Sequence, residues 1–109
     1  MLKSLTTIEA RKLNKMRAIH PGEILREEFL IPLGLSAHAL AVALRVAAPR
    51  INDIVREKRG ITPDTALRLA RYFNSTPQFW LNLQTSYDLK TARLASWQKI
   101  EREVLPHAA

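Results

Sequence analysis

Apolar residues recur every three to four positions along most of this chain, a spacing typical of helices that bury one face. Prolines stand where several of these stretches begin, and only three glycines interrupt the chain. Alternating runs of β-branched residues, which would indicate strands, are absent. The pattern therefore predicts an all-α fold.

The first predicted helix begins at Pro21 and closes before Pro32, because proline suits a first turn and disrupts a helix interior. Gly34 then breaks the chain, and Ser36 is a good N-cap for a short second helix that ends near Arg45. The predicted buried faces are Ile24, Leu25, Phe29 and Leu30 in the first helix and Leu40, Ala41 and Leu44 in the second.

Three more helices follow, each with a proline in its first turn. One starts at Ala48-Pro49, buries Ile51, Ile54 and Val55, and is ended by residues 58–60. The last two start at Thr62-Pro63 and Thr76-Pro77, where threonine caps the helix. Asn74 is the predicted stop of the fourth helix and Pro106 that of the fifth, and their apolar faces are Ala66, Leu69, Ala70 and Phe73, and Phe79, Trp80, Leu83, Tyr87, Leu94, Trp97, Ile100 and Val104.

The length of 109 residues fits one domain. Residues 1–16 show weak periodicity and are predicted to be a basic, frayed extension, with Met16 as a possible alternative start. The predicted domain therefore covers residues 17–109. No apolar run is long enough for a membrane span and the first residues lack a signal-peptide pattern, so a cytoplasmic protein is expected.

The chain carries a formal charge of +7 and has no cysteine. The charge favours a polyanionic partner, and the positive residues concentrate in residues 1–20 and 36–60. Without cysteine there is no disulfide framework or thiolate metal site, and the three histidines lack metal-ligand spacing. Glycine-rich nucleotide loops are also absent, so neither an enzyme nor a cofactor is expected.

Residues 36–56 predict two short helices joined by about three residues, which is helix-turn-helix geometry. Ala41 is small enough for the two helices to approach closely, and Val46 fills the turn. Arg45 occupies the turn position that usually requires a positive φ, which costs a residue other than glycine on the order of 1 kcal/mol. The motif predicts a protein that binds duplex DNA.

The second helix of this motif presents one face outward if its isoleucines are buried. Arginine and asparagine there suit guanine and adenine edges, and proline or alanine can touch a thymine methyl group. Basic residues just past the helix and the start of the preceding helix suit phosphates. The predicted DNA-binding residues are Ser36, His38, Ala48, Pro49, Arg50, Asn52, Asp53, Arg56, Lys58 and Arg59.

Several segments together resemble the HigA-type antitoxins of the lambda-repressor-like (XRE) helix-turn-helix class. They are His20–Leu30 (HPGEILREEFL), Arg50–Val55 (RINDIV), Arg59–Thr62 (RGIT), Asp64–Ala70 (DTALRLA) and Phe79–Gln84 (FWLNLQ). The likeness covers residues 17 to about 95. It implies a five-helix DNA-binding domain with a longer C-terminal helix, a homodimer, binding to the operator of its own toxin–antitoxin operon, and neutralisation of a HigB-type mRNA-cleaving toxin.

Arg50 and Asn52 match the family's Arg-Ile-Asn in the DNA-reading helix, whereas Ala47-Ala48-Pro49 departs from the more polar residues usual there. The C-terminal helix is the expected dimer contact, through Tyr87, Leu94 and Trp97, while Trp80 is assigned to the core.

Two other functions compete with that of an autorepressing antitoxin. A stand-alone transcriptional regulator without a toxin partner fits the same residues, because toxin recognition has no local motif. A small basic ribonuclease would need a β-sheet and a cluster of His, Arg, Lys or Glu around a scissile phosphate, and the sequence offers neither.

Overall fold

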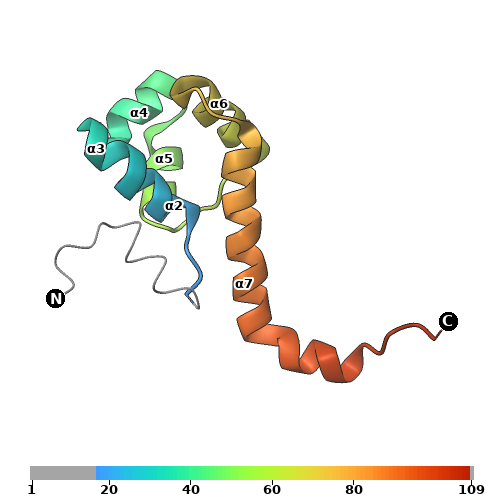
Figure 1. The fold of residues 1–109 in the computed structure, drawn as a ribbon. Coiled ribbons are helices and arrows are strands. Elements are labelled where there is room, and N and C mark those ends of the chain that lie inside the picture. Colours follow the sequence, from blue (N-terminus) through green and yellow to red (C-terminus); the bar gives the residue numbers. More distant parts are fainter. Residues whose placement is uncertain (1–16, 109) are drawn as a thin grey trace, which may run out of the picture.

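The computed structural model describes residues 17–108, so the predicted extension at residues 1–16 lies outside the described residues. The described chain is helical and contains no strand. A continuous first helix is followed by four more, which confirms the predicted all-α class (Figure 1). The elements are α2 (Pro21–Ile24), η1 (Leu25–Leu30), α3 (Ile31–Leu33), α4 (Ala37–Leu44), α5 (Ala48–Val55), α6 (Pro63–Phe73) and α7 (Pro77–Glu103).

The first helix passes through Pro32, so the prediction that it closes before this residue was wrong. Proline lacks an N–H and its ring collides with the carbonyl four residues earlier in a regular α-helix. Here η1 is a π-helical segment, and the N–H of Ile31 donates to the carbonyl of Arg26, five residues earlier. The wider turn makes room for the ring, and the helix ends instead at Gly34, whose φ is 62°.

The predicted helix starts are confirmed by their caps. The side chains of Ser36, Thr62 and Thr76 each accept a hydrogen bond from the backbone N–H three residues later. The predicted ends at Arg45 and Asn74 are also confirmed, since both residues adopt the left-handed conformation.

The third predicted helix, α5, ends before residues 58–60, as expected. Its last residue is Val55, and Arg56 is its C-cap. Glu57 then takes a positive φ of 63°, and its N–H donates to the carbonyl of Ile54. Lys58 and Arg59 therefore lie on the loop beyond the helix, as predicted for the residues that end it.

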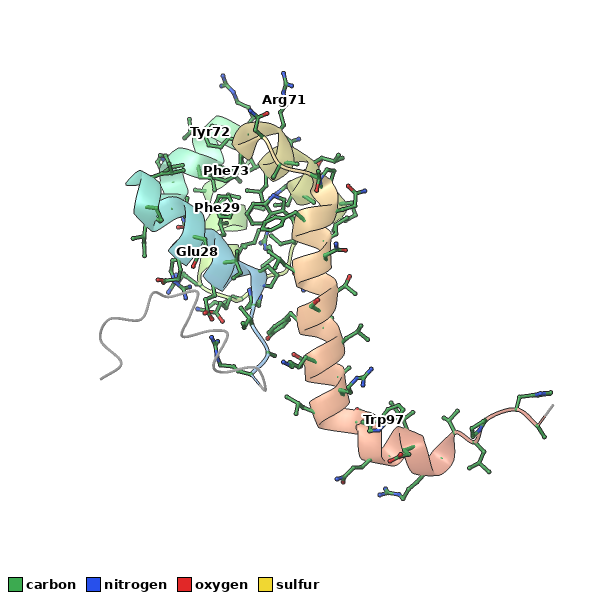
Figure 2. All side chains as sticks on the ribbon, viewed as in Figure 1. Glu28, Phe29, Arg71, Tyr72, Phe73 and Trp97 are labelled. Carbon is green, nitrogen blue, oxygen red and sulfur yellow. The ribbon has the colours of Figure 1, made fainter. Side chains whose placement is uncertain are left out.

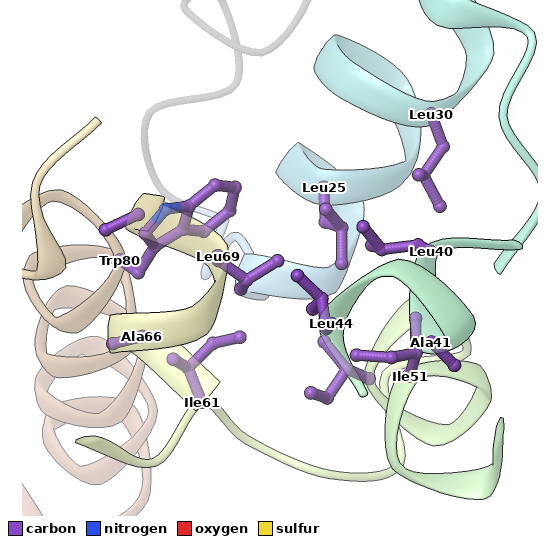
Figure 3. Close-up of a cluster of buried hydrophobic side chains, with 12 residues drawn as sticks. Leu25, Leu30, Leu40, Ala41, Leu44, Ile51, Ile61, Ala66, Leu69 and Trp80 are labelled. Atoms are coloured by element: carbon purple, nitrogen blue, oxygen red, sulfur yellow. The ribbon is translucent and has the colours of Figure 1, made fainter. Parts of the chain in front are cut away.

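A core of apolar side chains from every helix holds the domain together (Figure 3). Trp80 is fully buried, as predicted, and its indole N–H donates to Ser75 Oγ at 3.1 Å. Phe29 and Phe73 face each other beside it, with ring centroids 4.8 Å apart, but they and Val55 are half-buried rather than buried (Figure 2). The buried core is Leu25, Leu30, Leu40, Ala41, Leu44, Ile51, Ile54, Ile61, Ala66, Leu69, Ala70 and Trp80.

The last helix, α7, projects away from the other helices (Figure 1). The radius of gyration is 16.8 Å, against about 13 Å for a compact domain of this size. The projecting part carries large apolar side chains in contact with solvent, among them Leu94, Trp97 and Val104.

No single helix in residues 17–108 is long and apolar enough to cross a membrane. The helices at Pro21–Leu33 and Ala37–Leu44, bent at 96° to each other, reach that length and composition only as a pair.

His20 caps the first helix from inside the domain. Its Nδ1 accepts a hydrogen bond from the N–H of Gly22 at 2.9 Å, and its ring packs edge-on against Tyr87 with centroids 4.8 Å apart. Burial lowers the pKa of His20 below its ordinary value of 6.5 and outweighs the opposing charges of Glu57 and Asp88. The imidazole is thus held neutral, because a protonated Nδ1 could not accept this bond.

We predict that the free energy of unfolding decreases as the pH falls below 6.5. The unfolded chain then binds a proton at His20 that the folded chain excludes. The contribution of neutral His20 to the free energy of unfolding is therefore complete above pH 6.5, and it is lost as the pH falls to the lower pKa of the folded chain. Urea unfolding at several pH values measures it. His20→Asn retains a cap acceptor that does not titrate, so its profile should be flatter, and equally steep profiles in both proteins would contradict the assignment.

Candidate nucleic-acid interface

Helices α4 and α5 form a helix-turn-helix unit, as predicted. Leu40 and Leu44 of α4 and Ile51 and Ile54 of α5 are all buried in the shared core. Ala41 is 1% exposed between the two helices, where a larger side chain would hold them apart. One side of α5 is therefore fixed and the other is left facing outward.

A short turn connects the two helices. Arg45 has φ 61° and ψ 43°, so it takes the left-handed conformation expected at this position. The N–H of Val46 donates to the carbonyl of Ala41 at 3.1 Å, which closes the end of α4, and the Val46 side chain packs against the core.

The outward face of α5, with its C-cap, carries half of the predicted DNA-binding residues. Pro49 and Arg56 are exposed, whereas Arg50, Asn52 and Asp53 are partly exposed. Ala47 is the N-cap of α5 and makes no side-chain cap. Pro49 has no N–H, and the N–H of Arg50 donates to the carbonyl of Ala47 at 3.0 Å, so the first turn of α5 offers a phosphate few free backbone donors.

The remaining predicted residues lie at the start of α4, in the first turn of α5 and on the loop after α5. Ser36 Oγ already accepts the N–H of Ala39 at 3.0 Å, which leaves its hydroxyl proton to donate elsewhere. His38 is exposed in the first turn of α4, while Ala48 is half-buried and packs against the core. Lys58 is exposed on the loop after α5.

Arg50 and Arg59 line one hollow of about 240 Å³, together with Gly60, Thr62, Asp64 and Thr65. Both arginines are paired. Arg59 Nη2 lies 3.3 Å from Asp53 Oδ2, and Arg50 Nη1 donates to Asp64 Oδ2 at 2.5 Å. By contrast, neither Arg56 nor Lys58 makes an ion pair with any residue of the described chain, so both are available to phosphates.

Asp64 joins three helices at this site. Besides Arg50 of α5, its Oδ2 accepts from Arg68 Nε at 2.9 Å, and Arg68 Nη1 donates to the carbonyl of Leu44 at the end of α4 at 2.8 Å. The hydrogen bonds from Arg50 and then Arg68 lower the pKa of Asp64 below its ordinary value. The carboxylate is therefore charged throughout the physiological range.

Sequence reasoning missed the residues that brace this site. Arg26 of η1 donates to the carbonyl of Val55, the last residue of α5, at 2.6 Å, and also pairs with Glu27 and Glu57. Gln84 Oε1 accepts the N–H of Ile61 at 2.6 Å. The spacing of Asp64 and Arg68 by four residues was the one local signal that could have revealed part of this network.

Within residues 17–108, no three His, Asp or Glu side chains are grouped so that they could hold a metal ion.

The family described as Helix-turn-helix matches residues 25–80, about half of the chain. Virulence-associated protein I of Dichelobacter nodosus is 72% identical over 72% of this chain and 73% of its own length. The solved Pseudomonas aeruginosa antitoxin HigA with the higBA promoter is 56% identical, covers 84% of this chain and 100% of its own, and has a TM-score of 0.82. The solved structure of antitoxin GraA in complex with its operator is 53% identical, covers 85% of this chain and 94% of its own, and has a TM-score of 0.81.

Proposed function

This chain belongs to the helix-turn-helix family and groups with its HigA-type antitoxins, and from that premise we propose that it represses its own operon and neutralises a cognate toxin. The family and the fold expected from the sequence are confirmed. The observation that carries the proposal is α5, whose buried side is locked into the core while Arg50 and Asn52 stand on its outer side.

In this proposal α5 enters the major groove of duplex DNA. Arg50 donates two hydrogen bonds to guanine O6 and N7, Asn52 pairs with adenine, and Ala48 or Pro49 touches a thymine methyl group. Phosphates are contacted by the flanks, which fixes the orientation of the helix without reading sequence. The flanking residues are Ser36, His38, Arg56, Lys58 and Arg59, and Asp53 holds Arg59 from the recognition helix.

We expect Arg50→Ala to weaken binding to the duplex upstream of the chain's own reading frame by ~1 to 3 kcal/mol. It should also relax the sequence preference, because a base contact is lost. Lys58→Ala should instead weaken binding to every duplex alike and lower the slope of log K against log salt by about one ion. Fluorescence anisotropy across a salt series separates the two effects.

The matched control duplex has the same length and base composition in shuffled order. If the wild-type chain binds both duplexes equally, the charge of the chain rather than its helix-turn-helix accounts for binding. If Arg50→Ala discriminates as well as the wild type, α5 is not the reading helix.

We propose that residues 17–109 act as one DNA-binding domain that dimerises through the projecting part of α7. Leu94 is 69% exposed and Trp97 is 47% exposed, which is unusual for large apolar residues on one helix face. Tyr87 lies two turns before Leu94 on the same side and is half-buried against His20, at the inner end of the surface. A dimer would present two recognition helices to half-sites ~34 Å apart.

Trp97→Glu should convert the dimer to a monomer, because the substitution places a charge in an apolar contact. Sedimentation velocity at several concentrations measures the change. Lys99→Glu lies on the opposite side of α7 and should leave the association unchanged. A wild-type chain that sediments as a monomer, or a Trp97→Glu variant that still dimerises, would refute this interface.

The toxin partner distinguishes an antitoxin from a stand-alone regulator. We expect the product of a small basic reading frame beside this gene to arrest growth when expressed alone. Co-expression of this chain should restore growth, and the two proteins should then co-purify. Absence of rescue would leave a DNA-binding repressor without a toxin.

A further inference from the structure

The side chain proposed to read guanine is held by a carboxylate from another helix. Arg50 Nη1 donates to Asp64 Oδ2 at 2.5 Å, across 14 positions of sequence. The pair is at the surface, since the Arg50 side chain is 34% exposed and that of Asp64 is 56% exposed. A solvent-facing pair of this kind contributes little to folding by itself, so its place at the reading helix calls for another explanation.

Asp64 is well placed to fix the direction of Arg50. It lies in the first turn of α6, behind the Thr62 cap and Pro63. Its carboxylate is held from the other side by Arg68, which is itself tied to the carbonyl of Leu44. The end of α4, the start of α6 and the start of α5 are therefore connected through the Asp64 carboxylate and the Arg68 guanidinium.

The guanidinium group retains donors for DNA. Arginine has five N–H donors in a planar fork, and Asp64 takes one of them through Nη1. The donors that remain suffice for a two-point contact with guanine. Since ordering a mobile arginine costs conformational entropy, an arginine already ordered by Asp64 loses less freedom on binding.

The charge of Asp64 acts in the opposite direction on non-specific binding. Asp64 lines the same hollow as Arg50 and Arg59, on the face that would approach the phosphates. A carboxylate there repels a polyanion on any sequence and competes with a phosphate for Arg50. Only a duplex that offers the right base edge then recovers the full contact.

We propose that Asp64 is a positioning residue for sequence discrimination: it aims Arg50 at a base and opposes its capture by phosphate. This inference rests on the proposed DNA-binding function and concerns a residue absent from the predicted contact set. Asp64 itself donates no hydrogen bond to DNA, because a carboxylate only accepts.

The test measures the ratio of affinities for the upstream duplex and its shuffled counterpart. Asp64→Asn should lower this ratio about tenfold, because the two-point base contact of Arg50 is weakened, while affinity for the shuffled duplex rises. Glu103→Gln removes one negative charge at the exposed end of α7, away from the site, and should retain the wild-type ratio. If Asp64 had a merely structural role, its substitution would weaken binding to both duplexes to the same extent.

A double-mutant cycle assigns the effect to Arg50. In an Arg50→Ala background, Asp64→Asn should change the ratio little, because the side chain it positions is gone. Arg68→Met retains the Asp64–Arg50 pair without its brace and should give a partial loss, which keeps the test valid if Asp64→Asn folds poorly by circular dichroism.

The outcomes separate this inference from the proposed function. Equal wild-type affinity for both duplexes would refute sequence-specific binding itself. The role of Asp64 alone would be overturned if the wild-type chain discriminates between the two duplexes and the folded Asp64→Asn or Arg68→Met variant retains the same affinity ratio. An equal effect of Asp64→Asn with and without Arg50 would overturn it as well.

Discussion

An eight-residue helix such as α5 is not stable by itself in water. The position of its outward face therefore depends on the contacts by which the rest of the domain holds the helix. Ile51 and Ile54 are fully buried on the inward side. Gly22 lies so close to α5 that a Cβ added there would come within 1.8 Å of the carbonyl oxygen of Ile54. Arg26 closes the same end of α5 through the carbonyl of Val55. Helix α5 is thus held along its side and at its end by the first helix.

The same constraint determines where charge can be used. The chain is strongly basic, but the arginines nearest the outward face are not simply free cations. Arg50 is paired with Asp64 and Arg59 with Asp53, whereas Arg56 and Lys58 have no ion-pair partner within residues 17–108. Paired arginines have a fixed direction, which favours discrimination, and unpaired cations give affinity for any phosphate backbone. Net charge alone would not have separated these two roles.

The parts of the fold that the sequence predicted depend on neighbours a few positions apart. Ser36, Thr62 and Thr76 are predictable as caps because their hydroxyl groups suit the position before a helix, and each does accept the N–H three residues later. Arg45 is predictable because it stands at the turn position that requires a positive φ. The prediction that Pro32 ends the first helix is wrong, because a proline is tolerated inside a helix when the preceding turn widens to a π-helix. No residue in this segment indicates that widening from the sequence alone.

The bracing of the site escaped prediction for a different reason. Arg26 reaches Val55 across 29 positions, Gln84 reaches Ile61 across 23, and Asp64 reaches Arg50 across 14. Such partners are decided by how the helices cross, and helix periodicity carries no information about that. The outward residues of α5 could be predicted because burial of two isoleucines determines the opposite face of the same helix.

Helix α7 connects the DNA-reading part to the surface proposed for dimerisation. Trp80, in its first turn, is fully buried, and Tyr87 packs on His20, so the first half of α7 is fixed to the domain. Trp97 lies 17 residues beyond Trp80, which is about 26 Å along a helix. A dimer formed there would fix the separation of the two copies of α5 through one continuous helix rather than through a linker. The buried tryptophan would then limit the spacing of half-sites although it touches no DNA.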